Sequence, residues 1–431
     1  MPKPINKKYI LIFFLRACIT AVLTLLLVNI FEKRQEAVLY PSVFKPVGEF
    51  ETDPRIWGEN FPFEYDTYTK TEINEGQTFY GGSDPFQRLD RFPILKTLFA
   101  GMPFSVDYRE DRGHYWALHD VKETKRISEK SPNTCITCKS SNVVEGIEKM
   151  GTENFYKAMF KDVGAHYDKS ISCIDCHNPK TMELRISRPS FTEAMERRGI
   201  DIKKASRQEM RSYVCAQCHV EYYFKGPGKY LTFPWDKGLS VDSIEAFYDE
   251  YGFSDWTHQI SGAEMVKIQH PEFELWSTGI HARSGVSCAD CHMPYERIGS
   301  VKVTSHWIRS PLKNINNACQ TCHKWDEAEL INRVKIIQDR VFVTLTKTEL
   351  AISDAINSIK KAKESGATDE QLLFARKLHR KAQIRWDFIS AENSMGFHSP
   401  QETLRVLSEA INYARLSQLE AEKITKGLAD R

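Results

Sequence analysis

Cys135-Ile-Thr-Cys138-Lys139 is the first of five stretches in which two cysteines are separated by two residues. The other four have the same spacing and end in histidine: Cys173-Ile-Asp-Cys176-His177, Cys215-Ala-Gln-Cys218-His219, Cys288-Ala-Asp-Cys291-His292 and Cys319-Gln-Thr-Cys322-His323. Ten of the eleven cysteines in the 431 residues belong to these pairs, and Cys18 lies alone in an apolar N-terminal stretch. Such uniform gaps are not typical of a disulfide scaffold. The pattern therefore indicates sites that bind cofactors.

The residue after each cysteine pair identifies the cofactor. In a c-type haem site, two sulfurs add to the vinyl groups and the following histidine coordinates the iron. Zinc knuckles are the alternative, but zinc would bring the pairs together two by two and leave the fifth pair over. Neither zinc nor a redox Cys-x-x-Cys motif explains the four histidines. The sequence predicts covalent haem at the four histidine motifs and a fifth haem, with Lys139 as ligand, at the first.

A count of axial ligands separates a carrier from a catalyst. The motifs fill five of ten axial positions, and nine further histidines remain: His114, His119, His166, His258, His270, His281, His306, His379 and His398. An electron carrier would use five of them, whereas an enzyme would use four and leave one iron open to substrate. The first motif is the candidate for the open iron, because an amine lacks the second nitrogen by which proteins orient histidine ligands. The alternative is that Lys139 is a surface lysine beside a degenerate motif. Spacing alone does not choose among the nine histidines.

The composition is that of a globular protein without a basic excess. Charged residues make up 27% and aromatic residues 11% of the chain. Lys and Arg number 59 and Asp and Glu 57, which gives a net charge of +2. This balance argues against a nucleic-acid partner.

The N-terminal residues predict export. An apolar run from Tyr9 to Phe31 follows three lysines and is long enough, at about 34 Å, to cross a bilayer core of about 30 Å. No small-residue cleavage site follows the run. Arg16 lies within the run and is the residue that argues against a membrane span. We expect an uncleaved signal anchor in residues 1–35, with a cleaved signal peptide as the alternative. The basic leader places the rest of the chain outside the inner membrane.

The pattern after the anchor predicts a mainly α, compact multihaem fold with few strands. Residues 36–325 hold the five motifs in short helices and loops. Residues 326–431 are expected to form three long helices, at about 326–364, 369–394 and 400–426. Thr368–Gln371 and Ser399–Glu402 have the pattern of capping boxes, and Gly366 and Gly396 are placed to end the preceding helices.

One Cys-x-x-Cys-Lys followed by four Cys-x-x-Cys-His resembles the pentahaem cytochrome c nitrite reductases, the ammonia-forming enzymes. Local stretches share the likeness, which extends over roughly residues 45–425: Arg112-Gly113-His114, Asp120-Val121-Lys122-Glu123-Thr124-Lys125-Arg126, His219-Val220-Glu221-Tyr222-Tyr223 and Lys267-Ile268-Gln269-His270-Pro271-Glu272. The resemblance implies six-electron reduction of nitrite to ammonium on the lysine-ligated haem, with Arg126, Tyr222 and His270 lining its open face. These residue types suit the task, since Arg and protonated His bind an anion and His and Tyr supply protons. Each also has a plainer interpretation. Arg126 could belong to a solvated helix face, Tyr222 could pack against a haem, and His270 could be an ordinary haem ligand.

The same resemblance implies the remaining ligands. A calcium ion beside the active haem would be bound by Glu221, the carbonyl oxygens of Tyr222 and Lys267, and Gln269, all oxygen donors as a hard cation requires. The distal histidines would be His306 for the second haem, His114 for the third, His398 for the fourth and His281 for the fifth. His119, His166, His258 and His379 stay unassigned.

The resemblance also implies partners: a membrane quinol-oxidising cytochrome c as electron donor, and a second copy bound through the C-terminal helices. The expected place is the periplasm, tethered by the N-terminal segment. Two alternatives stay open. One is a multihaem electron-transfer protein without an open iron, and the other is the same enzyme acting on hydroxylamine or sulfite.

Overall fold

Short helices joined by loops carry the five cysteine motifs. The computed structural model describes residues 7–37, 40–41, 43–73, 76–82, 84–110, 112–299 and 301–430. It is 57% helical and 6% strand, which confirms the mainly α class. The helices before the C-terminal part are α2 (Pro54–Gly58), α3 (Pro62–Thr69), α4 (Arg88–Arg91), α5 (Leu95–Leu98), α6 (Ala117–Glu123), α7 (Asn142–Met150), α8 (Thr152–Lys157), α9 (Cys173–Cys176), α10 (Pro189–Arg197), α11 (Arg207–Ala216), α12 (Val241–Tyr251), α13 (Glu272–Ser277), α14 (Ile280–Arg283), α15 (Cys288–His292) and α16 (Ile315–Ala318).

The strands form three small antiparallel hairpins. They are β1 (Tyr223–Lys225) with β2 (Tyr230–Thr232), β3 (Trp256–Thr257) with β4 (Glu264–Met265), and β5 (Tyr295–Ile298) with β6 (Val301–Thr304). The hairpin of β1 and β2 follows the third motif closely. The short loop between His219, where the motif ends, and Tyr223, where β1 begins, carries Glu221 and Tyr222.

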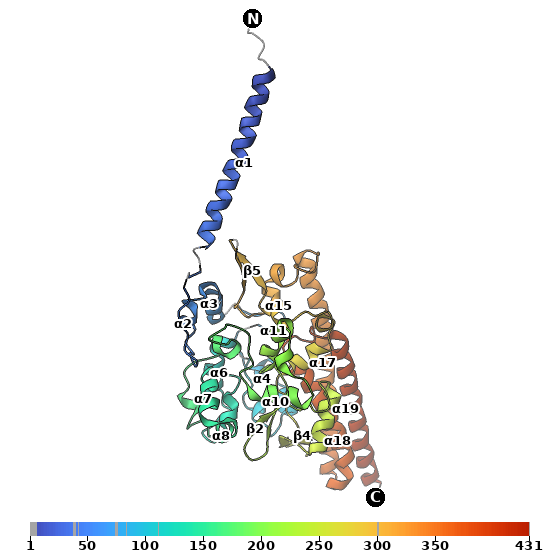
Figure 1. Ribbon diagram of the computed structural model, residues 1–431. Helices are drawn as coiled ribbons and strands as arrows, with labels where there is room; N and C mark the ends of the chain where they lie inside the picture. Colours follow the sequence, from blue (N-terminus) through green and yellow to red (C-terminus); the bar gives the residue numbers. More distant parts are fainter. Residues whose placement is uncertain are drawn as a thin grey trace.

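Three long helices make the C-terminal part, and they lie side by side along one edge of the molecule (Figure 1): α17 (Glu327–Glu364), α18 (Asp369–Ser390) and α19 (Pro400–Ala429). The predicted capping box begins α18, where the Thr368 hydroxyl accepts the Gln371 N–H at 3.3 Å and the Gln371 side chain accepts the Thr368 N–H at 2.8 Å. Gly366 follows the end of α17 with a φ of 94°, as a glycine at this position of a helix end allows.

The second predicted capping box is wrong. Ser399 precedes α19 with φ −153° and ψ 82° and makes no side-chain cap bond. Glu402, the residue expected to complete the box, instead pairs with Arg405 at 2.6 Å. Pro400 at the first helical position supplies no N–H and already has the helical φ, so the helix begins without the box.

Two predicted boundaries also shift. α18 ends at Ser390 rather than 394, and α19 continues to Ala429 rather than 426. Beyond α18, the Glu392 carboxylate accepts the N–H of Ser394 at 3.1 Å, a local bond that replaces a helical one. Gly396, expected to end the helix, lies instead in the following turn with a φ of 77°. This turn presents His398.

The N-terminal helix α1 (Lys7–Ala37) projects from the body as a separate rod (Figure 1). Its segment Lys7–Arg34 is long and apolar enough to cross a membrane, a property that signal sequences share. The apolar side chains of this segment are exposed, among them Leu11, Phe13 and Leu25.

Three apolar clusters of buried residues lie in the described part of the chain. The largest joins α17, α18 and α19 to α12 and the β3–β4 hairpin, with Tyr248, Met265 and Trp386 fully buried. The second includes Ile136 of the first motif and Ala216 of the third. The third is small and joins α17, α18 and α19. The first and third motifs thus contribute residues to the packed core.

Candidate functional site

All ten motif cysteines line one cavity of about 1900 Å³. Pockets for a single drug-sized ligand are about 300–1,000 Å³, so this cavity suits several large groups. Of the histidines in the described part of the chain, nine line the cavity: His114, His177, His219, His270, His281, His292, His306, His323 and His398. They are the four motif histidines, the four expected distal ligands and His270. The four unassigned histidines are not among its lining residues.

Four pairs of histidine rings face each other across this cavity at nearly equal separations. The ring centroids are 6.1 to 6.3 Å apart in the following pairs: His114 with His219, His177 with His306, His281 with His323, and His292 with His398. Two metal–nitrogen bonds of about 2 Å each, with half of each ring, add up to roughly 6 Å. Each pair therefore fits one iron between its rings. The pairing is the same as the one that the resemblance implied for the second to fifth haems.

Hydrogen bonds at Nδ1 orient these rings. Nδ1 lies 2.8 Å from the Met182 carbonyl oxygen in His177, 3.1 Å from that of Arg309 in His292 and 2.8 Å from that of Thr304 in His306. In His398 it lies 2.5 Å from a carboxylate oxygen of Glu392. Because these oxygens accept, Nδ1 carries the proton and Nε2 presents its lone pair to a metal.

Serine and aspartate shape two of the motif helices. In Ser172-Cys173-Ile-Asp175-Cys176 the Asp175 carboxylate accepts the Ser172 N–H at 2.7 Å, and a capping box starts α9. Ser287 and Asp290 make the same box at α15, with a 2.8 Å bond. The repeated Ser-Cys-x-Asp-Cys pattern is the signal in the sequence from which both boxes could have been predicted.

The thiols show how the motifs adjoin. The sulfur of Cys138 in the first motif lies close to that of Cys218 in the third, and the sulfur of Cys215 in the third lies close to that of Cys288 in the fourth. Haems attached at these cysteines would have neighbouring edges, which short-range electron transfer requires.

Lys139, Tyr222 and His270 are among the residues that line the cavity, and Tyr222 lies near the cysteines of the first motif. Burial raises the pKa of the Tyr222 hydroxyl, and the nearby thiols of the first motif raise it further. Tyr222 is therefore a neutral O–H donor beside that motif. The half-buried guanidinium of Arg126 lies over the Phe104 ring, 4.0 Å from its centroid, with Nε 3.1 Å from the Thr124 hydroxyl. Its charge acts on both Cys135 and Tyr222.

Three of the four residues predicted to bind calcium, Glu221, Lys267 and Gln269, are joined by hydrogen bonds. Glu221 is fully buried, and its two carboxylate oxygens accept the Tyr248 O–H and the Gln269 N–H, each at 2.6 Å. The Gln269 side-chain amide lies 3.0 Å from the Lys267 carbonyl oxygen. Burial raises the pKa of Glu221, to which the charge of Glu274 adds. A buried carboxylate beside a carbonyl and an amide is a donor set that suits a hard cation.

The Lys267 side chain is directed away from these donors and anchors the loop. Its ammonium pairs with Asp387 of α18 at 2.9 Å, and both side chains are about 1% exposed. The other Asp387 oxygen accepts the Ile268 N–H at 2.8 Å. Because this loop continues into His270, α18 helps to position a residue of the cavity wall.

Two of the unassigned histidines belong to the scaffold. His379 lies fully buried between the Ser261 hydroxyl and the Gln383 side chain, each 3.0 Å from a ring nitrogen. His258, also fully buried, bonds to the Thr97 carbonyl oxygen at 3.0 Å. Both rings have ordinary packing and hydrogen-bonding roles.

Residues 53–430 match the family model of cytochrome c552. The chain belongs to the cytochrome c552 family. It is 45% identical to the cytochrome c-552 of Parabacteroides distasonis over 85% of this chain and 75% of that one. It is 42% identical to that of Bacteroides fragilis over 96% and 86%. Among solved structures, it is similar to the catalytic subunit of the cytochrome c nitrite reductase of Desulfovibrio desulfuricans, whose description names two calcium sites. That likeness has 34% identity, a TM-score of 0.84, and covers 89% of this chain and 88% of the other.

Membership of the cytochrome c552 family confirms the family expected from the motifs and makes covalent haem the cofactor of the cysteine pairs. It explains why one cavity contains all ten cysteines and why histidine rings face each other across it.

Proposed function

We propose that this protein reduces nitrite to ammonium by six electrons at a haem held by Cys135, Cys138 and Lys139. The observation that supports this most is the arrangement of the cavity histidines. Eight of the nine form ring pairs that suit four six-coordinate irons. His270 is the ninth, and it lines the cavity together with Tyr222 and Lys139. The four ring pairs belong to the second to fifth motifs, so the motif with lysine is the one outside these pairs.

The chain's own residues have distinct tasks in this proposal. The haem, when bound, supplies electrons and a coordination position for nitrite. Arg126 and protonated His270 attract and hold the anion electrostatically, an effect that a buried site strengthens. Reduction of nitrite to ammonium consumes eight protons and releases two waters. Tyr222, kept as a neutral O–H by its raised pKa, and His270 would pass protons to the oxygen atoms that leave.

Calcium completes the proposed site. Glu221, the carbonyl oxygens of Tyr222 and Lys267, and the Gln269 side chain would bind the ion. It would compensate the buried charge of Glu221 and fix the two segments that carry Tyr222 and His270. The calcium sites named for the Desulfovibrio enzyme support this proposal.

We further propose that the protein works in the periplasm, tethered through α1, and receives electrons from a membrane quinol-oxidising cytochrome c. Ile336, Val343 and Leu350 of α17 are 41–54% exposed and seven residues apart, so they lie on one face of the helix. Such a stripe fits a second copy bound through the C-terminal helices. Analytical ultracentrifugation of the chain and of a Leu350→Arg variant would test the dimer.

Steady-state turnover with nitrite, with ammonium quantified as the product, tests the proposed reaction. We expect near-stoichiometric ammonium and one haem with a spectrum unlike the other four. A multihaem electron carrier is the alternative, and six-coordinate low-spin iron at all five haems with no nitrite turnover would establish it. Turnover with hydroxylamine or sulfite but not nitrite would change the substrate and keep the site.

A further inference from the structure

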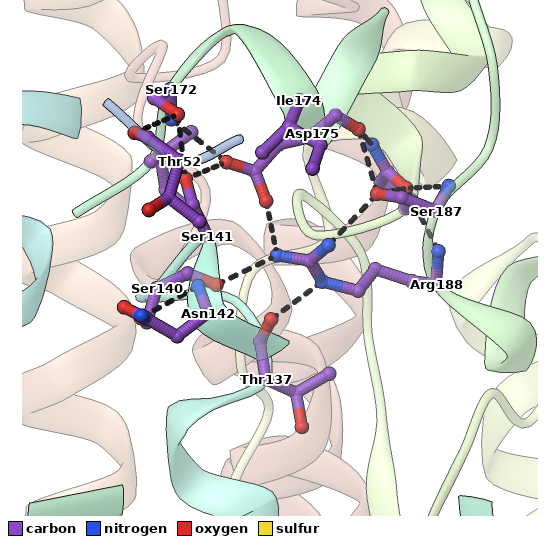
Figure 2. Close-up of polar contacts among 12 residues, drawn as sticks. Thr52, Thr137, Ser140, Ser141, Asn142, Ser172, Ile174, Asp175, Ser187 and Arg188 are labelled. Carbon is purple, nitrogen blue, oxygen red and sulfur yellow. Dashed lines mark hydrogen bonds and ion pairs between the residues drawn. The ribbon is translucent and has the colours of Figure 1, made fainter. Parts of the chain in front are cut away.

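Arg188 is a buried cation at the junction of the first three motifs, outside the residues that face the substrate. It immediately precedes α10, and its side chain is 1% exposed. Figure 2 shows its guanidinium surrounded by backbone and side-chain oxygens from several loops. A buried charge is costly unless each of its donors is satisfied. The hydrogen-bond partners of Arg188 therefore indicate its role in the protein.

The first set of partners brackets the lysine ligand. Nε donates to the Thr137 carbonyl oxygen at 2.7 Å, and Nη2 donates to the Ser140 carbonyl oxygen at 3.1 Å. Thr137 and Ser140 stand directly before Cys138 and directly after Lys139. One rigid guanidinium thus holds both ends of the segment that carries a haem sulfur and the proposed iron ligand.

The second set of partners belongs to the second motif. Nη2 of Arg188 pairs with the Asp175 carboxylate at 2.6 Å, a bond between two side chains that are each less than 5% exposed. The other Asp175 oxygen accepts the Ser141 O–H at 2.5 Å. Ser141 follows Ser140, so Asp175 also binds the segment after Lys139 (Figure 2).

The third motif meets the same junction through Gln217. Its side-chain oxygen accepts the N–H groups of Ser187 and Arg188 at 2.9 and 3.2 Å. Its amide nitrogen donates to the Asp175 carbonyl oxygen at 2.9 Å. Thr137, Asp175 and Gln217 occupy the same place in their motifs, directly before the second cysteine. The Ser187–Arg188 pair therefore links the equivalent residue of three motifs.

The fourth motif provides an internal comparison. Arg211 of α11 donates to Asp290 at 2.9 Å and lies 3.2 Å from the Tyr295 hydroxyl, and it is 7% exposed. Asp290 occupies the same motif position as Asp175. Arg211 thus makes the same arginine–aspartate bond at the fourth motif, at a place away from Lys139.

We propose that Arg188 is a positioning residue that holds Lys139 as an iron ligand and raises the reduction potential of the haem at the first motif. The proposal rests on the function proposed above. A fixed positive charge destabilises the oxidised iron more than the reduced iron, so it raises the potential. The bonds on both sides of Lys139 limit the movement of its segment. Because the Arg188 side chain bonds to Thr137, Ser140, Asp175 and Ser187, and none of these faces the substrate in the proposed site, we expect its loss to affect turnover rather than nitrite binding.

The test compares Arg188→Gln with Arg211→Gln in the full-length holoprotein. Spectroelectrochemical titration gives the potential of each haem, and electron paramagnetic resonance gives the signal of the lysine-ligated haem. We expect Arg188→Gln to lower the potential of that haem, alter its signal and reduce kcat roughly tenfold or more with little change in KM. Arg211→Gln should leave the signal of the lysine-ligated haem as it is and shift that of the fourth haem.

Arg188→Lys keeps the charge but loses the planar set of guanidinium donors, so it separates the effect of the charge on the potential from the effect of the hydrogen bonds on the Lys139 segment. It also replaces Arg188→Gln in the test if that variant yields no holoprotein. We expect a nearly normal potential with an altered lysine-haem signal. An Arg188 variant with the wild-type signal, potential and kcat would overturn the proposal, as would equal changes at that haem from Arg211→Gln. A wild-type protein without nitrite turnover would instead reject the proposed function, whatever the Arg188 variants do.

Discussion

Glu221→Gln tests whether the buried donor cluster binds calcium. Glu221 is the only carboxylate among the four proposed donors, and its side chain is fully buried. The change keeps the volume of the side chain and removes its charge. A cation at this position loses the electrostatic attraction that compensates its desolvation. Calcium should therefore bind the variant far more weakly than it binds the wild-type protein.

The magnitude has two parts. Calcium at about 1,000 times its Kd stabilises the folded state by about 4 kcal/mol, and this part should fall below about 1 kcal/mol in the variant. The second part does not depend on calcium. The Glu221 oxygens accept two hydrogen bonds of 2.6 Å, from Tyr248 and Gln269. A glutamine accepts only one of them and turns its NH₂ toward the other donor, at a cost of about 1–3 kcal/mol.

Thermal unfolding with excess calcium and with a chelator separates the two parts, because only the first changes between the two conditions. Glu349→Gln is the matched control, since Glu349 is another buried glutamate, bonded to Trp386 in the C-terminal helices. We expect this control to retain the full calcium-dependent shift. An equal calcium-dependent shift in Glu221→Gln and wild type would refute the assignment of Glu221 as a ligand.

Three further changes address the active site and the scaffold. His270→Ala and Tyr222→Phe should each lose most nitrite turnover and keep five haems, as measured by ammonium assay and pyridine haemochrome, because they remove proton donors and leave the motifs intact. Lys139→His should keep its haem but change the potential in a redox titration, since imidazole replaces an amine. Burial raises the pKa of Glu349 from 4.5 to about 7, so the folded state holds this proton more tightly than the unfolded state. The stability due to this proton is lost as pH rises from about 4.5 through about 7. Glu349→Gln should then be more stable than wild type by about 3 kcal/mol at pH 8 and show little difference at pH 4.5 in thermal unfolding.

For each of these predictions, a specific experimental result would contradict it. Full turnover in both His270→Ala and Tyr222→Phe would reject the active-site assignment. An unchanged potential in Lys139→His would mean that lysine is not an iron ligand. A stability difference for Glu349→Gln that stays constant from pH 4.5 to 8 would show that Glu349 titrates normally.

The sequence predicted the features that covalent chemistry fixes. Cys-x-x-Cys-His spacing specifies a haem site almost without reference to the fold, so the five attachment sites could be read directly. Periodicity and the Thr368–Gln371 box likewise predicted the long helices. The box at Ser399 was wrong because Pro400 starts the helix by itself, and a pattern of residue types does not show which start is used.

The pairing of distant residues was not accessible in the same way. His114 meets His219 and His306 meets His177 only after intervening helices have packed, and no local spacing encodes this. The resemblance implied these pairs in advance, and the ring centroids lie 6.1 and 6.2 Å apart in the structure. Neither local spacing nor the resemblance pointed to Arg188. It precedes a short helix in a charged stretch, and only the fold shows that its fork reaches the Thr137 and Asp175 oxygens.

The third motif has a central position that the order of the sequence hides. Its two cysteines lie close to cysteines of different motifs, Cys218 to Cys138 of the first and Cys215 to Cys288 of the fourth. Its Gln217 binds the Ser187–Arg188 junction, which also holds the first and second motifs. Electrons that reach the first haem from the fourth would therefore pass the third. The Ser187–Arg188 segment would keep the distance between these haems constant through successive reductions, so the proposed six-electron reaction would need no movement of the chain between electrons.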